Sequence, residues 1–337
     1  MSHFQHPDIP PARFHEYSGD LTMRVSIAFI VMEILAVGLR YTSLLLSEKS
    51  FGVDDFLILP GLVVCLGLDI NGILGVQLGR VGWHLDVVKV IDPEALIPWA
   101  NILLVCPILY SAACMIPRVV ILTLYLRVFN EKGYRIACYI LMGLVISLGV
   151  ADILTGALEC IPVQYLWDKS ISGHCIDLPL FFRWGTLPNV IMDFLMLILP
   201  QPVIWKLQVS KQVKIGLAVT ILTGSVGMIT SIIRCVAFFQ HDPLEDGTWA
   251  SVTFVNWSII EPGVYLLAAC LPCYRPLIKA LCQRRPRGSP NHSADTYLDI
   301  SDSKGLEGSW KTGSGRTIDN INELEMHNYP ETRARSL

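Results

Sequence analysis

The sequence predicts an all-α membrane protein, built as a bundle of seven transmembrane helices. Three observations lead to this fold class. Of the 337 residues, 52% are hydrophobic and only 16% are charged, whereas a soluble domain carries about 25% charged residues. The apolar residues gather in seven runs, each long enough for the roughly 20 residues that cross a bilayer. The segments between these runs are too short to hold a soluble domain.

The order of the predicted spans follows the apolar runs. We expect them at residues 23–46, 54–78, 98–126, 135–158, 182–205, 214–239 and 250–273. The third span is long enough to tilt or to project beyond the bilayer. Because the connections are short, we expect consecutive helices to be antiparallel neighbours.

The segments outside the membrane domain 23–275 differ from it in composition. Residues 1–22 are polar and lack the apolar stretch of a cleavable signal sequence. Residues 276–285 combine basic with apolar residues, which suits an amphipathic helix on an anionic lipid surface. Residues 286–337 are rich in Gly, Ser, Asp and Asn, and we expect a disordered tail because such a composition buries too little surface to fold.

Lys and Arg fall mainly in alternate loops, and this bias predicts the orientation of the chain. The richer loops include Arg127, Lys206, Lys211 and Lys214, whereas residues 240–249 contain neither Lys nor Arg. We therefore expect the N-terminus outside and the C-terminus in the cytosol. The four basic residues form a candidate cytosolic face for coupling to a signalling protein.

Ionisable residues interrupt the predicted spans, although a charge at bilayer depth is costly unless it faces a partner or water. They are Glu33, Asp69, Arg118, Asp152, Asp193, Arg234 and Glu261. At 1.5 Å per residue, Glu33, Asp193 and Glu261 lie roughly 15 Å below the outer surface. All except Arg118 fall in the outer half, and together with Trp257 they form a candidate pocket.

Three interpretations of these residues stay open. The first is that they pair only with one another and fix the packing of the helices. The second is that the outer-half group lines a cavity that binds a ligand from outside, and the third is passage of protons or ions. We expect Arg234 to pair with Glu261 or Asp193. We expect Arg118 to form an inner ion pair with Asp54 or Asp55.

Cys160 and Cys175 share the polar loop between the fourth and fifth spans. On an oxidising face of the membrane, two cysteines in one loop are expected to form a disulfide. A bond from Cys175 to Cys106, near the start of the third span, is the alternative.

The sequence argues against several chemistries. A covalently bound retinal needs a buried Lys, and none of the spans has one in its interior. Membrane-embedded metal hydrolases need several His residues at bilayer depth, but all eight lie in loops or termini. Asp152 and Asp193 stand on two helices like an intramembrane aspartyl pair, but neither has a Gly-x-Gly-Asp setting. We expect no enzyme activity, metal or cofactor, and the lack of a basic stripe argues against nucleic acid.

Several short motifs occur in a fixed order along the chain. They are Gly52-Val-Asp-Asp55; Gly79-Arg-Val-Gly-Trp-His84; Leu124-Tyr-Leu-Arg-Val-Phe129; Cys160-x-Pro162, Trp167 and Gly173-x-Cys175; Asp193 with Leu199-Pro-x-Pro202 and Trp205-x-Leu207; Arg234; and Trp257-x-x-x-Glu261 with Cys270-Leu-Pro272 and Arg275-Pro276. With these motifs the chain resembles the fungal rhodopsin-domain integral membrane proteins, the Pth-eleven-like and satratoxin-cluster type of seven-helix protein, over about residues 24–280.

The resemblance implies a membrane protein with neither retinal nor light sensing, and with a biochemical activity that is mostly undefined. A few members are viewed as surface sensors, and some lie in secondary-metabolite gene clusters. The family usually has a Lys where this chain has Arg118, which puts any role special to Lys in doubt.

We therefore predict a receptor-like sensor of the plasma membrane with an outward-facing polar pocket for a small molecule, tied to a secondary-metabolite gene cluster. Its partners would be the lipid bilayer, that ligand and a cytosolic signalling protein. One alternative is a transporter or exporter of a small metabolite that uses the carboxylates as proton sites. Another is a membrane scaffold without a ligand.

Overall fold

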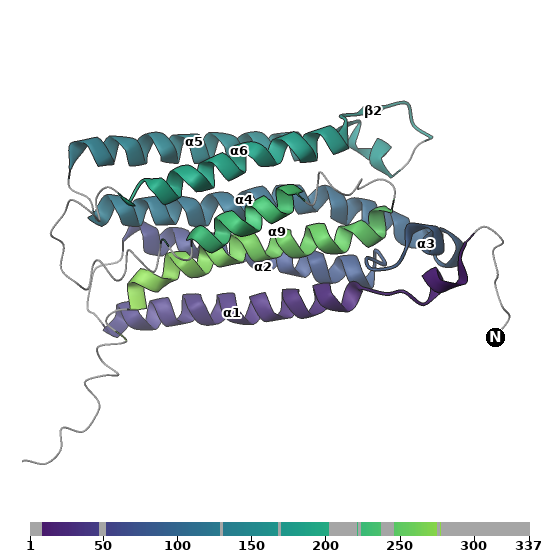
Figure 1. The fold of residues 1–337 in the computed structure, drawn as a ribbon, viewed down its shortest axis with the longest axis horizontal. Helices are drawn as coiled ribbons and strands as arrows, with labels where there is room; N and C mark the ends of the chain where they lie inside the picture. Colours follow the sequence, from purple (N-terminus) through teal and green to yellow (C-terminus); the bar gives the residue numbers. More distant parts are fainter. Residues whose placement is uncertain are drawn as a thin grey trace, which may run out of the picture. The chain divides into compact units, whose positions relative to one another are not determined.

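The computed structural model confirms an all-α membrane protein (Figure 1). It describes residues 9–46, 52–128, 131–167, 170–201, 221, 224–236, 246–274 and 277. Among these, five helices are long and apolar enough to cross a membrane: Pro11–Leu46, Val53–Gln77, Pro93–Arg127, Lys132–Ala157 and Gly247–Tyr274. Two shorter apolar helices, Trp184–Ile198 and Gly224–Val236, lie within the fifth and sixth predicted spans, 182–205 and 214–239, parts of which lie outside the described residues.

The helices begin and end close to the predicted positions. Their bounds are α1 Gly19–Leu46, α2 Val53–Gln77, α4 Leu96–Val128, α5 Lys132–Ala157, α6 Leu178–Ile198 and α9 Gly247–Cys270. The first helix starts at Gly19, inside the segment 1–22 that was expected to be a polar tail. Much of the predicted segment 276–285 and all of 286–337 lie outside the described residues.

The apolar runs form a bundle because each helix buries one side and leaves apolar side chains on the other. The central helix α4 packs on α2, α5 and α9, while α1 packs on α2 and α9, and α5 packs on α6. Ile58, Leu122 and Leu266 are fully buried in the core. Phe56 and Val63 on α2 are 80% and 68% exposed, as expected for side chains that face lipid tails.

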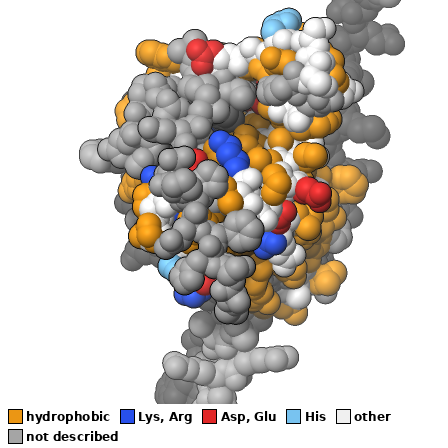
Figure 2. Space-filling model, turned by 90° about the vertical axis from the view of Figure 1, so that its right-hand side faces the viewer, with side chains coloured by type: hydrophobic (Ala, Val, Ile, Leu, Met, Phe, Trp, Pro, Cys, Tyr) orange, Lys and Arg blue, Asp and Glu red, His pale blue; other side chains and the backbone are white. Residues whose placement is uncertain are grey.

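Short elements that the apolar pattern did not predict lie at one end of the bundle, which we call the hairpin end. They are η1 Pro11–Phe14, α3 Leu85–Ile91, η2 Pro93–Ala95, β1 Cys160–Ile161, η3 Val163–Leu166 and β2 His174–Cys175. Strands β1 and β2 pair antiparallel, with Cys160 opposite Cys175. Figure 2 shows this end, where charged side chains stand in small groups among apolar and uncharged ones. At the opposite end of the bundle, η4 Leu271–Tyr274 follows α9.

The disulfide between Cys160 and Cys175 is confirmed. The alternative bond from Cys175 to Cys106 is wrong, because Cys106 is a free cysteine within α4. The bonded pair closes the β1–β2 hairpin and holds the residues between the two strands in one loop.

Polar contacts fasten the hairpin end of the bundle. His84, just before α3, lies 2.5 Å from Asp246 through Nδ1 and 2.9 Å from Glu16 through Nε2. The His84 ring also stacks on Trp249, with 4.2 Å between the ring centroids. Gly82 adopts a φ of +103° and its backbone N–H donates to the Thr248 carbonyl at 3.1 Å. A side chain at Gly82 would strain this turn, so the glycine permits α1, α3 and α9 to meet here.

Candidate functional site

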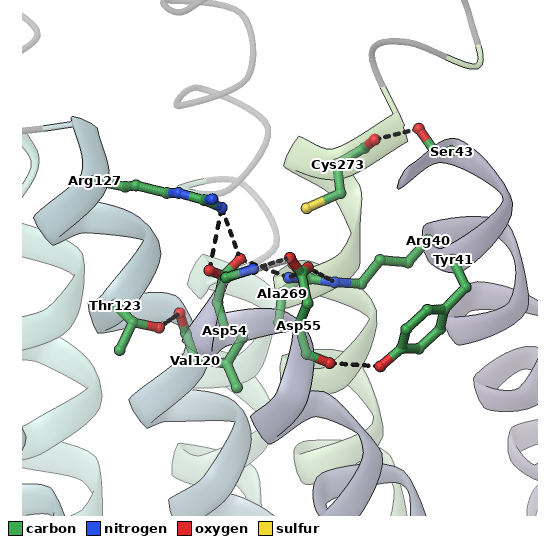
Figure 3. Close-up of polar contacts among 11 residues, drawn as sticks. Arg40, Tyr41, Ser43, Asp54, Asp55, Val120, Thr123, Arg127, Ala269 and Cys273 are labelled. Carbon is green, nitrogen blue, oxygen red and sulfur yellow. Dashed lines mark hydrogen bonds and ion pairs between the residues drawn. The ribbon is translucent and has the colours of Figure 1, made fainter. Parts of the chain in front are cut away.

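The first buried charge cluster joins α1, α2, α4 and α9 at the end opposite the hairpin (Figure 3). We call Arg40, Arg127, Asp54 and Asp55 the Arg40 cluster. Arg40 donates from Nη2 to Asp54 Oδ2 at 2.8 Å and to Asp55 Oδ1 at 2.6 Å. Its Nη1 donates to the Ala269 carbonyl at 2.7 Å. Arg127 donates to both carboxylate oxygens of Asp54, at 3.1 and 3.3 Å.

Local sequence completes the Arg40 cluster. The backbone N–H of Gly52 donates to Asp55 Oδ2 at 2.9 Å, which also caps the start of α2. The Tyr41 hydroxyl donates to the backbone carbonyl of Asp55 at 2.5 Å (Figure 3). With the bonds from Arg40, Arg127 and Gly52, all four side-chain oxygens of Asp54 and Asp55 accept a hydrogen bond. This cluster has the properties of a packing device, because its two positive and two negative charges are fully paired.

Part of the Arg40 cluster, together with Cys273, offers atoms of the kind that bind metal ions. One ligand atom each from Asp54, Asp55 and Cys273 lies within 4.8 Å of the others. However, Arg40 and Arg127 already neutralise both carboxylates, so we assign these groups to helix packing.

The prediction that Arg118 pairs with Asp54 or Asp55 is wrong. The arginine of α4 that meets Asp54 is Arg127, nine residues further along the helix. Nine residues correspond to about 13 Å of helix, so Arg118 lies deeper in the bundle. Sequence reasoning placed Arg118 too close to the helix end because it could not fix the register of α4 against α2.

Arg40 was not among the predicted site residues, although it stands within the span predicted at 23–46. The residue is fully buried, with 0% of its surface exposed. The signal for it was present as an arginine in an apolar run that is followed by an Asp-Asp pair. It was missed because arginines near the end of a span usually extend to the interface.

The second buried cluster lies within the bundle and consists of Arg118, Arg234, Asp193 and Glu261, which we call the Arg118 cluster. Arg234 Nε donates to Glu261 Oε2 at 3.0 Å, so the predicted pairing of Arg234 with Glu261 is confirmed. Arg118 Nη2 donates to Glu261 Oε1 at 3.2 Å and lies 2.8 Å from Asp193 Oδ1. All four residues are at most 5% exposed.

Neutral polar groups surround the Arg118 cluster. Tyr110 donates to Glu261 Oε2 at 2.9 Å and accepts a hydrogen bond from Arg234. Arg118 Nη1 donates to Asn189 Oδ1 at 2.9 Å, and Asn189 Nδ2 donates to Asp152 Oδ2 at 3.2 Å. Asp152, predicted for the same pocket, therefore joins the cluster through an amide. Sequence reasoning missed Tyr110 and Asn189, because uncharged polar residues in apolar runs are common.

Several atoms in and beside the Arg118 cluster have unused hydrogen-bonding capacity among the described residues. They are Asp193 Oδ1 and Oδ2, Arg118 Nε, Ser231 Oγ and the Tyr265 hydroxyl, and all are buried. The Ser231 and Tyr265 hydroxyls lie beside Asp193, close enough to interact with its carboxyl, but no well-formed hydrogen bond joins them among the described residues. The Arg118 guanidinium lies over the Tyr265 ring, 4.9 Å from its centroid. A narrow cleft between α4, α5 and α6 reaches this cluster and is lined in part by Ser111, Arg118, Asp152 and Asn189.

The remaining predicted site residues lie elsewhere. Glu33 on α1 and Asp69 on α2 are both 1% exposed and take no part in the Arg118 cluster. Trp257 is half-buried on α9, one turn before Glu261. Of the predicted coupling face, the structure describes Arg127, whose side chain is 52% exposed. Its other members, Lys206, Lys211 and Lys214, lie outside the described residues.

Comparisons with known proteins agree with this architecture. The polyenoic acids biosynthesis gene cluster protein Ba17b of Metarhizium anisopliae is 31% identical over 278 residues, which cover 79% of this chain and 76% of that protein. A SAT4 family membrane protein of Emericella nidulans is 29% identical over 229 residues, 65% of this chain and 57% of that protein. Receptor GIN3 of Arthrobotrys oligospora is 23% identical over 277 residues, 80% of this chain and 65% of that protein.

A family model described as the fungal rhodopsin domain matches residues 39–280, which include α2, α4, α5, α6, α9 and both charge clusters. The match covers well over half of the 337 residues. This chain therefore belongs to the fungal rhodopsin domain family of membrane proteins.

Proposed function

We propose that this chain is a receptor-like sensor of the fungal plasma membrane that binds a small molecule at the Arg118 cluster. It would cross the membrane seven times, with the hairpin end outside and the Arg40 cluster near the cytosolic face. The observation that carries the proposal is a set of buried polar atoms around Asp193 that lack a well-formed hydrogen bond among the described residues, although Asp193 Oδ1 forms an ion pair with Arg118. Buried polar atoms in proteins nearly always have a partner, so a ligand that supplies the missing hydrogen bonds would be stabilised there.

The charges of the Arg118 cluster indicate the class of ligand. Two arginines and two carboxylates cancel, so a charged ligand would leave the site unbalanced inside a low-dielectric bundle. Asp193 offers two acceptor oxygens, Arg118 Nε offers a donor, and the Tyr265 and Ser231 hydroxyls can do either. We therefore propose an uncharged molecule with hydroxyl or amide groups. It would be held without covalent chemistry, cofactor or catalysis.

Support for the sensing role comes from the similarity to a protein named Receptor GIN3. The proposed orientation follows from the Lys and Arg bias of the loops. Under it, Arg127, Lys206, Lys211 and Lys214 would form a cytosolic face for a signalling partner. Residues 1–22 would lie outside, and residues 276–337 would lie on the cytosolic side.

Export of a metabolite is the second candidate function, and the names of the relatives favour it. Besides the protein from Metarhizium anisopliae, a Fugralins biosynthesis cluster protein and a Wortmanamides biosynthesis cluster protein are each 24% identical to this chain. An exporter in such a cluster would carry the product out of the cell, whereas a sensor would respond to a molecule outside.

The two candidates can be separated in the native fungus. A deletion strain would be complemented with the wild-type gene, with Asp193→Asn, or with Ser147→Ala as a control at an exposed position on α5. All variants would be checked for equal amount and membrane location. Under the sensor proposal, Asp193→Asn reproduces the altered transcript profile of the deletion strain. The cells then do not retain the metabolite that the biosynthetic gene cluster produces. Retention of the metabolite with an unchanged transcript profile would contradict the sensor proposal and support export.

A further inference from the structure

His84 lies between two carboxylates that come from distant parts of the chain. Its ring Nδ1 is 2.5 Å from Asp246 Oδ2, at the start of α9, and its Nε2 is 2.9 Å from Glu16 Oε2, just before α1. The His84 side chain is 9% exposed, whereas those of Asp246 and Glu16 are 26% and 53% exposed. The imidazole therefore joins the segment that leads into α1 to the start of α9, and water reaches both carboxylates.

The two contacts of His84 require a proton on each ring nitrogen. An ionised carboxylate can only accept hydrogen bonds, and a neutral imidazole donates from one nitrogen and accepts at the other. A neutral His84 could donate to Asp246 or to Glu16, but its second nitrogen would then point a lone pair at the remaining carboxylate. With both carboxylates ionised, only the imidazolium form satisfies both contacts.

Asp246 is held more firmly than Glu16. The backbone N–H of Leu85 donates to Asp246 Oδ1 at 2.8 Å, so this carboxylate has a second donor. Among the described residues, the Glu16 side chain forms a hydrogen bond or an ion pair only with His84. When the ring loses a proton, we therefore expect the remaining N–H to stay with Asp246 and the contact with Glu16 to break.

The other charged groups at the hairpin end do not compensate these two carboxylates. They form two separate ion pairs of 3.0 Å, Arg13 with Asp86 and Arg80 with Asp92. Among the described residues, neither Glu16 nor Asp246 forms an ion pair with Arg or Lys. The titratable neighbours of Glu16 in sequence, His15 and Tyr17, are exposed. The proton on His84 thus cancels one of two otherwise uncompensated negative charges.

The indole of Trp249 adds a second reason why protonation matters here. Trp249 stands in the first turn of α9, and its ring stacks on His84 with 4.2 Å between the centroids and 7° between the planes. A cation over an indole face is attracted by the ring quadrupole, and a neutral imidazole loses this attraction. The nearby backbone bonds from Ser18 to Gly82 and from Gly82 to Thr248 do not depend on a proton. Loss of the proton would therefore loosen this end without unfolding it.

We propose that His84, Glu16 and Asp246 form a pH-sensitive latch, the His84 latch. In acid, the imidazolium holds the segment before α1 against the start of α9. Imidazole side chains change charge between about pH 5 and pH 8. As the pH rises through this range, the contact with Glu16 is lost and residues 9–18 are held more weakly. The latch therefore stabilises the hairpin end on the acid side of this range and not on the alkaline side.

The His84 latch does not depend on a ligand at the Arg118 cluster, because it uses different side chains. Only its external position rests on the proposed function. Under the proposed orientation the acidity of the medium would set the state of the latch, and the latch would act on α9, the helix that carries Glu261.

The test is a double-mutant cycle at positions 16 and 84, with the full purified chain in mixed micelles. Unfolding equilibrium constants from SDS titration would be measured at pH 5.5 and pH 8 for the wild type, Glu16→Gln, His84→Gln and the double variant. The cycle isolates the interaction between the two side chains, so the effects of other titrating groups cancel. We expect a coupling of about two- to fivefold in the equilibrium constant at pH 5.5, the size found for partly exposed ion pairs, and none at pH 8.

Two further measurements keep the test decisive. His15→Gln removes an exposed histidine beside Glu16 and should leave the pH dependence of the wild type unchanged. If His84→Gln fails to fold, Glu16→Gln alone decides: between pH 5.5 and pH 8 it should gain about two- to fivefold in stability relative to the wild type, because an amide has no charge to lose its partner.

Three results would overturn the proposal. The first is a coupling between positions 16 and 84 that is equal at both pH values or absent at both. The second is a stability difference between Glu16→Gln and the wild type that does not change with pH. The third is an effect of His15→Gln as large as that of His84→Gln, because the proton would then belong to another histidine.

Discussion

The Arg40 cluster and the Arg118 cluster have the same composition, two arginines and two carboxylates, yet they are completed differently. In the Arg40 cluster every carboxylate oxygen accepts a hydrogen bond, one of them from the backbone of Gly52. In the Arg118 cluster both oxygens of Glu261 accept hydrogen bonds. Among the described residues neither oxygen of Asp193 accepts a well-formed one, although Oδ1 lies 2.8 Å from Arg118 Nη2. Equal charge therefore does not mean equal role: the saturated cluster is suited to hold helices together, whereas the other keeps hydrogen-bonding capacity that the proposed ligand would use.

The largest loss of stability should follow from removal of Arg40, the arginine at the centre of the Arg40 cluster. Arg40→Ala leaves Asp55 without its ion pair and the Ala269 carbonyl without its donor. Breaking a buried ion pair in this way costs about 3–5 kcal/mol. We expect a corresponding loss in the free energy of unfolding, measured by titration of the purified chain with SDS in mixed micelles. Arg24→Ala removes an exposed arginine from the same helix and serves as the control. An equal loss in both variants would contradict the claim that the ion pairs of Arg40 hold the helices together.

Glu159 extends the comparison to a buried carboxyl beyond the end of α5 that has no ion pair among the described residues. Burial raises the pKa of this carboxyl to about 7. The folded state therefore keeps its proton where the unfolded state has lost it, and stability falls as the pH rises from about 4.5 to about 7. With allowance for solvent screening, the loss is about 2 kcal/mol.

Substitution of Glu159 isolates this effect. Glu159→Gln should match the wild type in unfolding free energy near pH 4.5 and exceed it by the same amount at pH 8, because an amide cannot ionise. Denaturation curves of both chains at the two pH values provide the measurement. If the difference between them did not change with pH, Glu159 would not be the group responsible.

The smallest loss of stability is expected from removal of Arg127, at the exposed edge of the Arg40 cluster. Arg127 is half exposed and shares Asp54 with Arg40, so its ion pair is screened by water. Arg127→Ala should lower the unfolding free energy by about 0–1 kcal/mol, measured by the same SDS titration. A loss as large as that of Arg40→Ala would show that burial does not set the strength of these pairs.

Sequence alone predicted those features that depend on short segments. The lengths of the apolar runs located the helices, and two cysteines in one loop identified the disulfide between Cys160 and Cys175. The sequence also predicted that Arg234 pairs with Glu261 or Asp193, because all three residues lie in the outer half of the spans, and Glu261 is its partner in the structure.

The features that sequence could not predict depend on the register between helices. The partners of Arg118 were assigned wrongly, because a shift of a few residues along α4 changes which helix face its side chain meets. The contacts of His84 with Glu16 and Asp246 join three segments far apart in the sequence. Such contacts leave no local pattern, since each residue alone is typical of a polar loop.

The most direct test of the difference between the two clusters is a parallel measurement of Asp55→Asn and Tyr265→Phe by SDS titration. Asp55 accepts charged hydrogen bonds from Arg40, so the account predicts a loss of about 2–3 kcal/mol in unfolding free energy for Asp55→Asn. Tyr265→Phe removes a buried hydroxyl that has no well-formed hydrogen bond among the described residues and keeps the ion pair between Asp193 and Arg118, so the account predicts a loss of less than about 1 kcal/mol. A loss for Tyr265→Phe as large as that for Asp55→Asn would contradict the account, because the polar atoms of the Arg118 cluster would then be as fully bonded as those of the Arg40 cluster.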